Sequence, residues 1–199
     1  LRRTMVTQTF DFFYDFASPY TYLAHKCLPK IEARTGARAV YKPMLLGGVF
    51  KATGNVSPIN VPAKMAYHRV DIRRFVSQHN LKFLHNPHFP VMTIGVMRGA
   101  VFAAGKDYET HYTQTVFDAM WVEGRKMDDP STIFETLTAA GLPADEIIAG
   151  TRHPDVKSAL IAATQAAVDR GAFGSPTLFV GDEMFFSKDA LGDLERALG

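Results

Sequence analysis

The chain has 199 residues, of which 47% are hydrophobic and 21% are charged, and this composition excludes a disordered or fibrous protein. Its 22 basic and 20 acidic residues are scattered and leave a formal net charge of +2, so no nucleic-acid partner and no membrane surface is predicted. The single cysteine, Cys27, excludes an intramolecular disulfide and a CxxC redox pair. Without a recognisable signal peptide or an 18-residue apolar span, we expect a cytoplasmic protein.

The first predicted element is a strand over residues 9–16, because aromatic residues occupy every second position from Phe10 to Phe16. The opposite side of this strand carries Asp11, Phe13 and Asp15, so we expect one strongly apolar face.

A helix follows the strand directly. Ser18 is a favourable N-cap, and Pro19 fits the first helical position, where its missing N–H is not needed. Residues 38–45 form the next apolar run and are predicted to be a second strand, parallel to the first. The glycine-rich stretch up to residue 61 is expected to be irregular.

The middle of the chain predicts a block of helices, since its apolar residues recur at intervals of three and four. One helix ends near Asn80, and further helices are predicted over 91–104, 108–124, 131–140 and 155–170.

Strand signals return only near the end, where residues 176–180 and 183–186 predict a hairpin before a last helix with Leu191, Leu194 and Leu198 on one face. The order β-α-β, helices, β-β-α predicts an α/β thioredoxin-like fold. We expect residues 1–61 and 172–199 to form the thioredoxin-like domain and residues 62–171 an inserted helical domain.

Ser18 is the first candidate for chemistry, because the N-terminus of a helix favours an anion such as a thiolate. A serine cannot form a disulfide there, but its hydroxyl can donate a charge-assisted hydrogen bond to the thiolate of a bound small molecule. The alternative is that Ser18 only caps the helix.

Ser175 and Pro176 form the second candidate stretch, because a proline before a late strand in this layout suggests a cis bond. The backbone of Ser175 would then pair with a peptide-like ligand beside Ser18. An ordinary trans proline at the start of a strand is the alternative. Ser187, Lys188 and Asp189 precede the last helix and suit the charged end of such a ligand, or simply cap that helix.

Lys51, Asn55 and Asn60 lie after the second strand, where a lysine can hold a carboxylate and the amides can orient it. The alternative for Lys51 is a solvated surface side chain. His85 and His88 have no further ligand at a suitable spacing, so no metal site is predicted.

Four stretches in this order carry a family resemblance: "DFASPYTYLA", "GVFKATGNVSPIN", "KMAYHRVDIRRF" and "FGSPTLFVGDEMFFSKDAL". Together they resemble the 2-hydroxychromene-2-carboxylate isomerases, which are similar to the kappa-class glutathione transferases and to DsbA-type thioredoxin folds. The resemblance covers nearly the whole chain and implies glutathione as cofactor and a homodimer.

The resemblance also implies roles for individual residues. Ser18 matches the catalytic serine that activates the glutathione sulfur. The implied substrate-site positions are Lys51, Asn55, Asn60, Val61 and Phe89. The implied glutathione-site positions are Ser18, Ser175, Pro176, Ser187, Lys188, Asp189 and Ala190. Two of these depart from the family pattern, since Ala190 stands where arginine is usual and Lys188 where a smaller polar residue is common.

The leading hypothesis is therefore a glutathione-dependent isomerase of the 2-hydroxychromene-2-carboxylate and trans-o-hydroxybenzylidenepyruvate type, acting on a small aromatic 2-oxo acid in bacterial aromatic, naphthalene-like catabolism. A borrowed thiolate adds to the conjugated system, a bond rotates, and the thiolate leaves. A kappa-class-like transferase or peroxidase and a non-catalytic thioredoxin-like peptide-binding protein are the alternatives.

Overall fold

The computed structural model describes residues 7–199. Its elements, in chain order, are β1 (Thr9–Tyr14), α1 (Pro19–Thr35), β2 (Arg38–Pro43), α2 (Leu46–Thr53), η1 (Pro58–Asn60), α3 (Pro62–His79), α4 (Ile94–Ala103), α5 (Glu109–Trp121), α6 (Pro130–Ala139), α7 (Ala144–Gly150), α8 (Pro154–Asp169), β3 (Thr177–Val180), β4 (Glu183–Phe186), η2 (Lys188–Ala190) and α9 (Leu191–Leu198).

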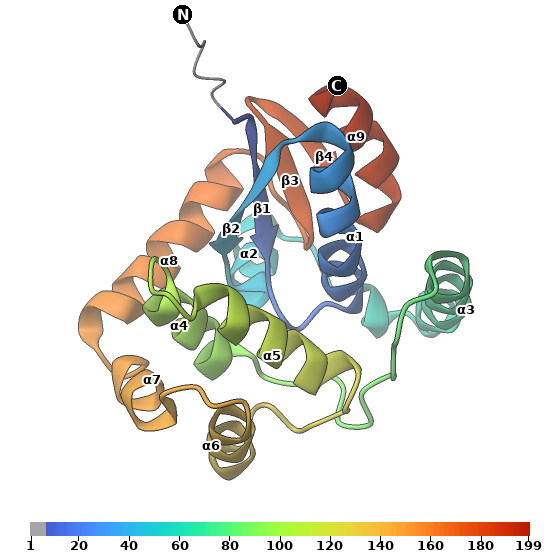
Figure 1. Cartoon of the computed structure of the whole chain (residues 1–199). Coiled ribbons are helices and arrows are strands. Elements are labelled where there is room, and N and C mark those ends of the chain that lie inside the picture. The colour runs from blue at the N-terminus through green and yellow to red at the C-terminus, as the bar shows by residue number, and fades with distance from the viewer. Residues whose placement is uncertain (1–6) are drawn as a thin grey trace, which may run out of the picture.

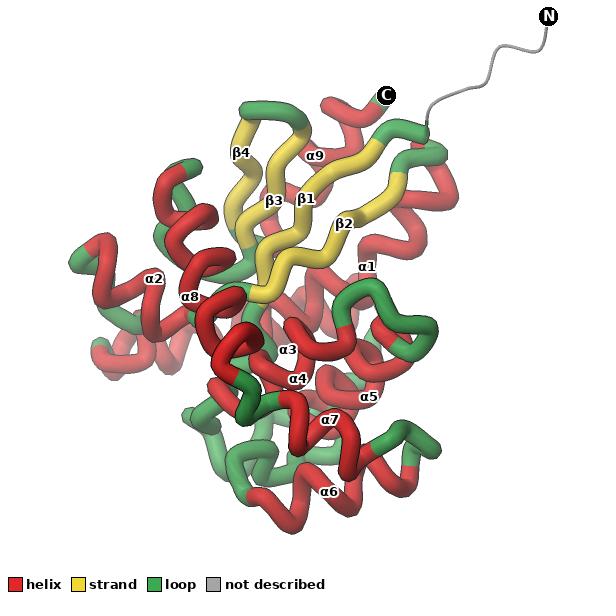
Figure 2. The backbone as a smooth tube through the Cα atoms, turned by 90° about the vertical axis from the view of Figure 1, so that its left-hand side faces the viewer, coloured by secondary structure: helices red, strands yellow, loops and turns green. Residues whose placement is uncertain are grey.

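The four strands form a single mixed sheet in the order β2-β1-β3-β4, and Figure 2 shows them side by side. β1 pairs with β2 in parallel, with Phe10 opposite Ala39, and with β3 antiparallel, with Phe12 opposite Leu178. β3 and β4 form the antiparallel hairpin. The parallel first pair and the late hairpin confirm the predicted thioredoxin-like order.

β1 has the strongly apolar face that the sequence predicts, with Phe10, Phe12 and Tyr14 buried, and Phe13 on its opposite face is buried as well. The Phe10 face packs with residues of α1 and α9, including Leu194, in the main core. On the opposite face Phe13 packs with Val49 of α2 and Ala167 of α8 in a second cluster. The reason is topological, because α8 returns from the end of the helical block to contact β2 and α2. Figure 1 shows α1 and α9 together on one side of the sheet.

The structure also corrects the helix assignments. Residues 46–53, expected to be irregular, form α2, although Gly47 and Gly48 lie in its first turn. Glycines destabilise the interior of a helix, but the burial of Val49 against the sheet stabilises α2. The break after residue 141 is followed by a short additional helix, α7, before α8 begins at Pro154.

The helices α4 to α7 lie beyond the carboxyl end of β1, whereas α3 stands apart from them and packs on α1 (Figure 1). One core cluster contains sheet residues such as Phe12 and helical-block residues such as Trp121, both fully buried. The division at residues 62 and 171 stays a prediction. No helix within residues 7–199 has the length and apolarity needed to cross a lipid bilayer.

Candidate functional site

Ser18 lies at the junction between β1 and α1 and is 8% exposed. Its extended backbone makes it the N-cap of α1, and its Oγ accepts a hydrogen bond from the Thr21 N–H at 3.3 Å. The same hydroxyl donates to the carbonyl oxygen of Ser175 at 3.1 Å. Ser18 therefore caps α1, and its hydroxyl proton points to the carbonyl oxygen of the residue before Pro176.

The Ser175–Pro176 peptide bond is cis, as the sequence suggested. The Ser175 side chain is held from two sides, because its Oγ accepts from the Asp15 N–H at 3.2 Å and lies 2.7 Å from the Thr21 hydroxyl. The Ser187 N–H donates to the Pro176 carbonyl at 3.0 Å. Two segments that are far apart in the sequence thus meet at the N-terminus of α1, and Ser187 is joined to the second of them.

Asp15 is a buried acid at this junction that the sequence analysis did not single out. Its carboxylate accepts hydrogen bonds from the Thr93 hydroxyl at 2.6 Å and from the N–H groups of Ala17 and Leu46 at 2.9 and 2.7 Å. Burial raises the pKa of Asp15, and these three bonds only partly oppose it. Asp15 joins the ends of β1, α2 and α4, so it fixes the backbone that carries Ser18.

Lys188 is almost fully buried, at 2% exposure, which the sequence did not predict. Its Nζ lies 2.8 Å from Asp71 of α3 and 2.6 Å from Asp189. The same ammonium faces the rings of Tyr20 and Phe75, 4.7 and 4.8 Å from their centroids. The positive charge of Lys188 therefore joins the segment before α9 to α3 and α1.

The carboxylates around Lys188 have different surroundings. Burial raises the pKa of Asp71, but hydrogen bonds from Lys188 and from the Tyr20 hydroxyl lower it further than burial raises it. Asp189 is mostly exposed and also accepts from the Ser187 hydroxyl at 3.2 Å. One ammonium with two carboxylates has a net charge of +1 − 2 = −1, which favours a cationic group beside Asp189. Ala190, which closes η2, contributes no charge.

The predicted residues after β2 do not form one cluster with Ser18. Lys51 lies on α2, Asn60 ends η1, and Val61 precedes α3; all three are exposed. Asn55 is also exposed, but its side-chain N–H donates to the carbonyl of Phe173 at 2.9 Å, two residues before Ser175.

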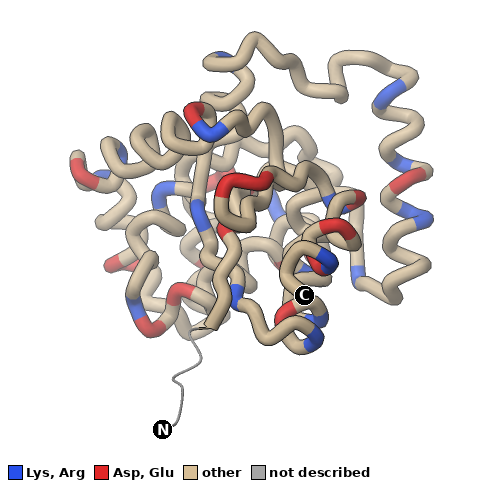
Figure 3. Tube along the Cα trace, turned by 90° about the horizontal axis from the view of Figure 1, so that it is seen from above, with Lys and Arg blue, Asp and Glu red and all other residues tan. Residues whose placement is uncertain are grey.

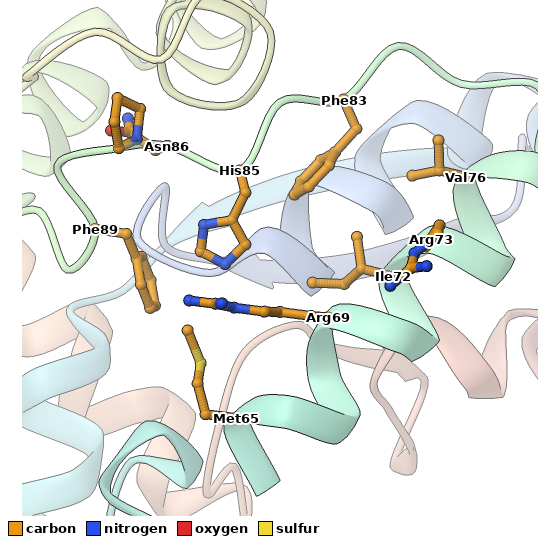
Figure 4. Close-up of a pocket in the computed structure, with 10 residues that line it drawn as sticks. Met65, Arg69, Ile72, Arg73, Val76, Phe83, His85, Asn86 and Phe89 are labelled. Atoms are coloured by element: carbon orange, nitrogen blue, oxygen red, sulfur yellow. The ribbon is translucent and has the colours of Figure 1, made fainter. Parts of the chain in front are cut away.

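Phe89 lies in the loop after α3 and packs against Trp121. Its ring is 5.9 Å from that of Trp121, whose indole N–H donates to the Phe16 carbonyl at 2.9 Å. It also lines a cleft of about 600 Å³ between α3 and the segment that follows it (Figure 4). This cleft could not be predicted from the sequence, because it depends on how the loop after α3 folds back along the helix.

The comparisons with known proteins agree with this geometry. The DSBA-like thioredoxin domain model matches residues 9–199. A 2-hydroxychromene-2-carboxylate isomerase from Pseudomonas putida is 30% identical, over 95% of this chain and 93% of the relative. The chain belongs to the 2-hydroxychromene-2-carboxylate isomerase family, within the DsbA-like thioredoxin proteins.

Two further relatives extend the comparison. The solved structure of a 2-hydroxychromene-2-carboxylate isomerase superposes with a TM-score of 0.87 at 28% identity, over 96% of this chain and 95% of the other. The human glutathione S-transferase kappa 1 is 26% identical, over 96% of this chain and 91% of the relative. The family of the chain is therefore related to an enzyme class named for glutathione.

Proposed function

We propose that this protein is a glutathione-dependent isomerase that interconverts 2-hydroxychromene-2-carboxylate and trans-o-hydroxybenzylidenepyruvate, or a close aromatic analogue. The observation that carries the proposal is the Ser18 hydroxyl, which caps α1 and donates to the carbonyl before a cis proline in a chain without a CxxC pair. The chain is similar over nearly its whole length to 2-hydroxychromene-2-carboxylate isomerases, and this similarity supports the choice of reaction. A homodimer is proposed from the resemblance alone, and a cytoplasmic location from the sequence signals described above.

The chain's own groups fit glutathione. The Ser175 carbonyl suits the cysteinyl N–H, and the net negative cluster of Lys188, Asp71 and Asp189 suits the γ-glutamyl ammonium. The amino end of α1 suits a thiolate. When bound, glutathione supplies a nucleophilic sulfur that adds to the conjugated double bond and leaves after rotation about the resulting single bond.

Ser18 would exchange partners when this site is filled. Without a ligand, the Ser18 hydroxyl donates to the Ser175 carbonyl. With glutathione bound, the hydroxyl would donate to the sulfur, and the carbonyl would accept from an N–H of the ligand backbone. The Ser18 hydroxyl and the Ser175 carbonyl would then each keep a hydrogen bond, with the ligand as the new partner of both. A charge-assisted bond together with the helix end contributes about 2 kcal/mol, and one pKa unit corresponds to about 1.4 kcal/mol. This is enough to bring a thiol pKa from about 8.5 towards neutrality.

The substitution Ser18→Ala tests this role. We expect turnover to fall by a factor of about 100 or more, because the thiolate loses its donor, while the free energy of unfolding falls by only about 1 kcal/mol. Asp129→Ala is a matched control, since Asp129 caps α6 with a 2.9 Å bond from the Thr132 N–H and lies outside the candidate site. It should lose similar stability and no activity. Equal turnover in the two variants contradicts the thiolate role.

A glutathione transferase is the second candidate, supported by the similarity to the kappa enzyme. The two functions differ in their use of glutathione, which an isomerase regenerates and a transferase consumes. Measuring glutathione during many turnovers separates them, and consumption in proportion to product excludes the isomerase. A peptide-binding protein without catalysis is favoured only if millimolar glutathione leaves the melting temperature unchanged.

A further inference from the structure

The cleft beside Phe89 has one basic wall and one aromatic wall. Met65, Arg69 and Arg73 follow one another at intervals of four along one side of α3. The facing segment contributes Phe83, His85 and Phe89. In Figure 4 the side chain of Arg69 reaches from α3 toward Phe89, between Met65 and the ring of His85.

The positive charge of this cleft is not neutralised by neighbouring side chains. No carboxylate is among the residues that line it, and no ion pair within residues 7–199 involves Arg69 or Arg73. Figure 3 shows basic positions repeated along α3. Burial lowers the pKa of His85, and the Arg69 charge lowers it further, so His85 is mainly neutral at pH 7. An anion is therefore the complementary charge for the cleft.

The other walls suit a flat ring. His85 meets Phe89 edge to face at 5.5 Å and Phe83 at 6.4 Å, so the three rings form a continuous aromatic surface opposite α3. A ring on this surface would bring a carboxylate within the reach of a guanidinium, which binds carboxylates with two parallel hydrogen bonds.

Both walls are attached next to Ser18 in the chain. On one side Phe89 packs on Trp121, whose N–H holds the Phe16 carbonyl. On the other side His68, the neighbour of Arg69, stacks on Tyr20 at 4.7 Å. Phe16 and Tyr20 are the second residues before and after Ser18, so both walls of the cleft are linked to residues that flank the proposed sulfur site.

We infer that this cleft binds the aromatic 2-oxo acid and that Arg69 holds its carboxylate. The inference rests on the proposed function for its substrate class. It places the binding group for the substrate carboxylate on α3. Lys51, the sequence-based choice, lies on α2 and does not line the cleft. Arg69 is thus a substrate-binding residue, and Arg73, one turn further along, adds to the positive charge.

The test measures binding of phenylpyruvate, an aromatic 2-oxo acid, by calorimetry without glutathione. Phenylacetone, which has a methyl group in place of the carboxylate, is the neutral comparison. We expect Arg69→Gln to weaken phenylpyruvate binding at least tenfold and Arg69→Lys to restore part of it. Arg74→Gln is the matched control on the same helix, because Arg74 is exposed and does not line the cleft, and it should change the affinity less than twofold.

Two results would overturn the inference. One is equal phenylpyruvate affinity in Arg69→Gln and Arg74→Gln, and the other is an equal effect of Arg69→Gln on phenylacetone. The single tryptophan, Trp121, gives a local signal, since a ligand against Phe89 should change its fluorescence. Phenylpyruvate binding is measured without glutathione, so failure of the glutathione mechanism leaves this affinity unchanged and the two hypotheses can fail separately.

Discussion

His25 allows a quantitative prediction about the pH dependence of stability. It is a buried histidine of α1 whose Nε2 lies 2.9 Å from the side-chain oxygen of Gln114 and whose Nδ1 lies 2.7 Å from the Tyr41 hydroxyl. Its ring also stacks on Phe117 at 4.6 Å. The neutral ring satisfies both neighbours by donating to Gln114 and accepting from Tyr41. Burial lowers the pKa of His25 from its ordinary value of 6.5 to about 4.

The direction of the pH dependence follows from the pH at which each state of the chain binds the His25 proton. The unfolded chain takes up a proton near pH 6.5, whereas folded His25 resists it until about pH 4, so its contribution to stability is present above pH 6.5 and lost as the pH falls. A difference of about 6.5 − 4 = 2.5 pKa units corresponds to about 3.4 kcal/mol at the acid limit. Between pH 7 and pH 5 the same relation gives a loss of about 2 kcal/mol.

Urea unfolding at pH 7 and pH 5 measures this loss directly. We expect the free energy of unfolding of the wild type to fall by about 2 kcal/mol more than that of His25→Gln, because the other titrating groups are common to both proteins. An equal fall in both proteins would refute the reasoning. Should the variant not fold, proton NMR of the wild type is decisive, since a His25 ring that titrates near pH 6.5 contradicts the burial argument.

Two further predictions concern packing and charge. Gly99→Ala should cost about 1–3 kcal/mol of stability, because a Cβ there would lie 2.0 Å from the hydroxyl of buried Tyr112. Gly95→Ala in the same helix meets nothing within 4 Å and should be neutral or up to about 1 kcal/mol stabilising, so equal effects in thermal unfolding contradict the contact. Lys188→Ala should cost about 2–3 kcal/mol at pH 7, because it leaves Asp71 without its ammonium. The cost should shrink at pH 3, and denaturant unfolding that shows no such change contradicts the ion-pair assignment.

Much of the fold could be predicted from the sequence because its strongest signals are local. Alternating aromatics marked β1, and the leucines of the last helix marked its buried face, with Leu194 fully buried. The errors arose where distant packing overrides local preference. α2 forms despite Gly47 and Gly48 because Val49 is buried against α8 and the sheet, and nothing near residue 46 in the sequence announces that contact.

Part of the candidate site could also be predicted, because some of its residues carry local sequence signals. A serine before a proline and a helix identifies Ser18, and a proline before a late strand identifies Ser175, since both signals lie within a few residues. The burial of Asp15 depends on Thr93, which is 78 positions away. The cleft depends on which face of α3 turns toward Phe89, and the weak amphipathic pattern of that helix, with only Ile72 buried, does not reveal it.

Lys188 explains one departure from the family pattern and connects the two parts of the candidate site. The absence of arginine at Ala190 suggested that Asp189 lacks a supporting cation, yet Lys188 supplies one from two positions earlier. Because the same ammonium also binds Asp71 on α3, the proposed glutathione-binding segment is held to the helix that carries Arg69. The cation beside Asp189 thus comes from position 188 in place of position 190. Through Asp71 it also links the proposed glutathione site to the helix that lines the proposed substrate cleft.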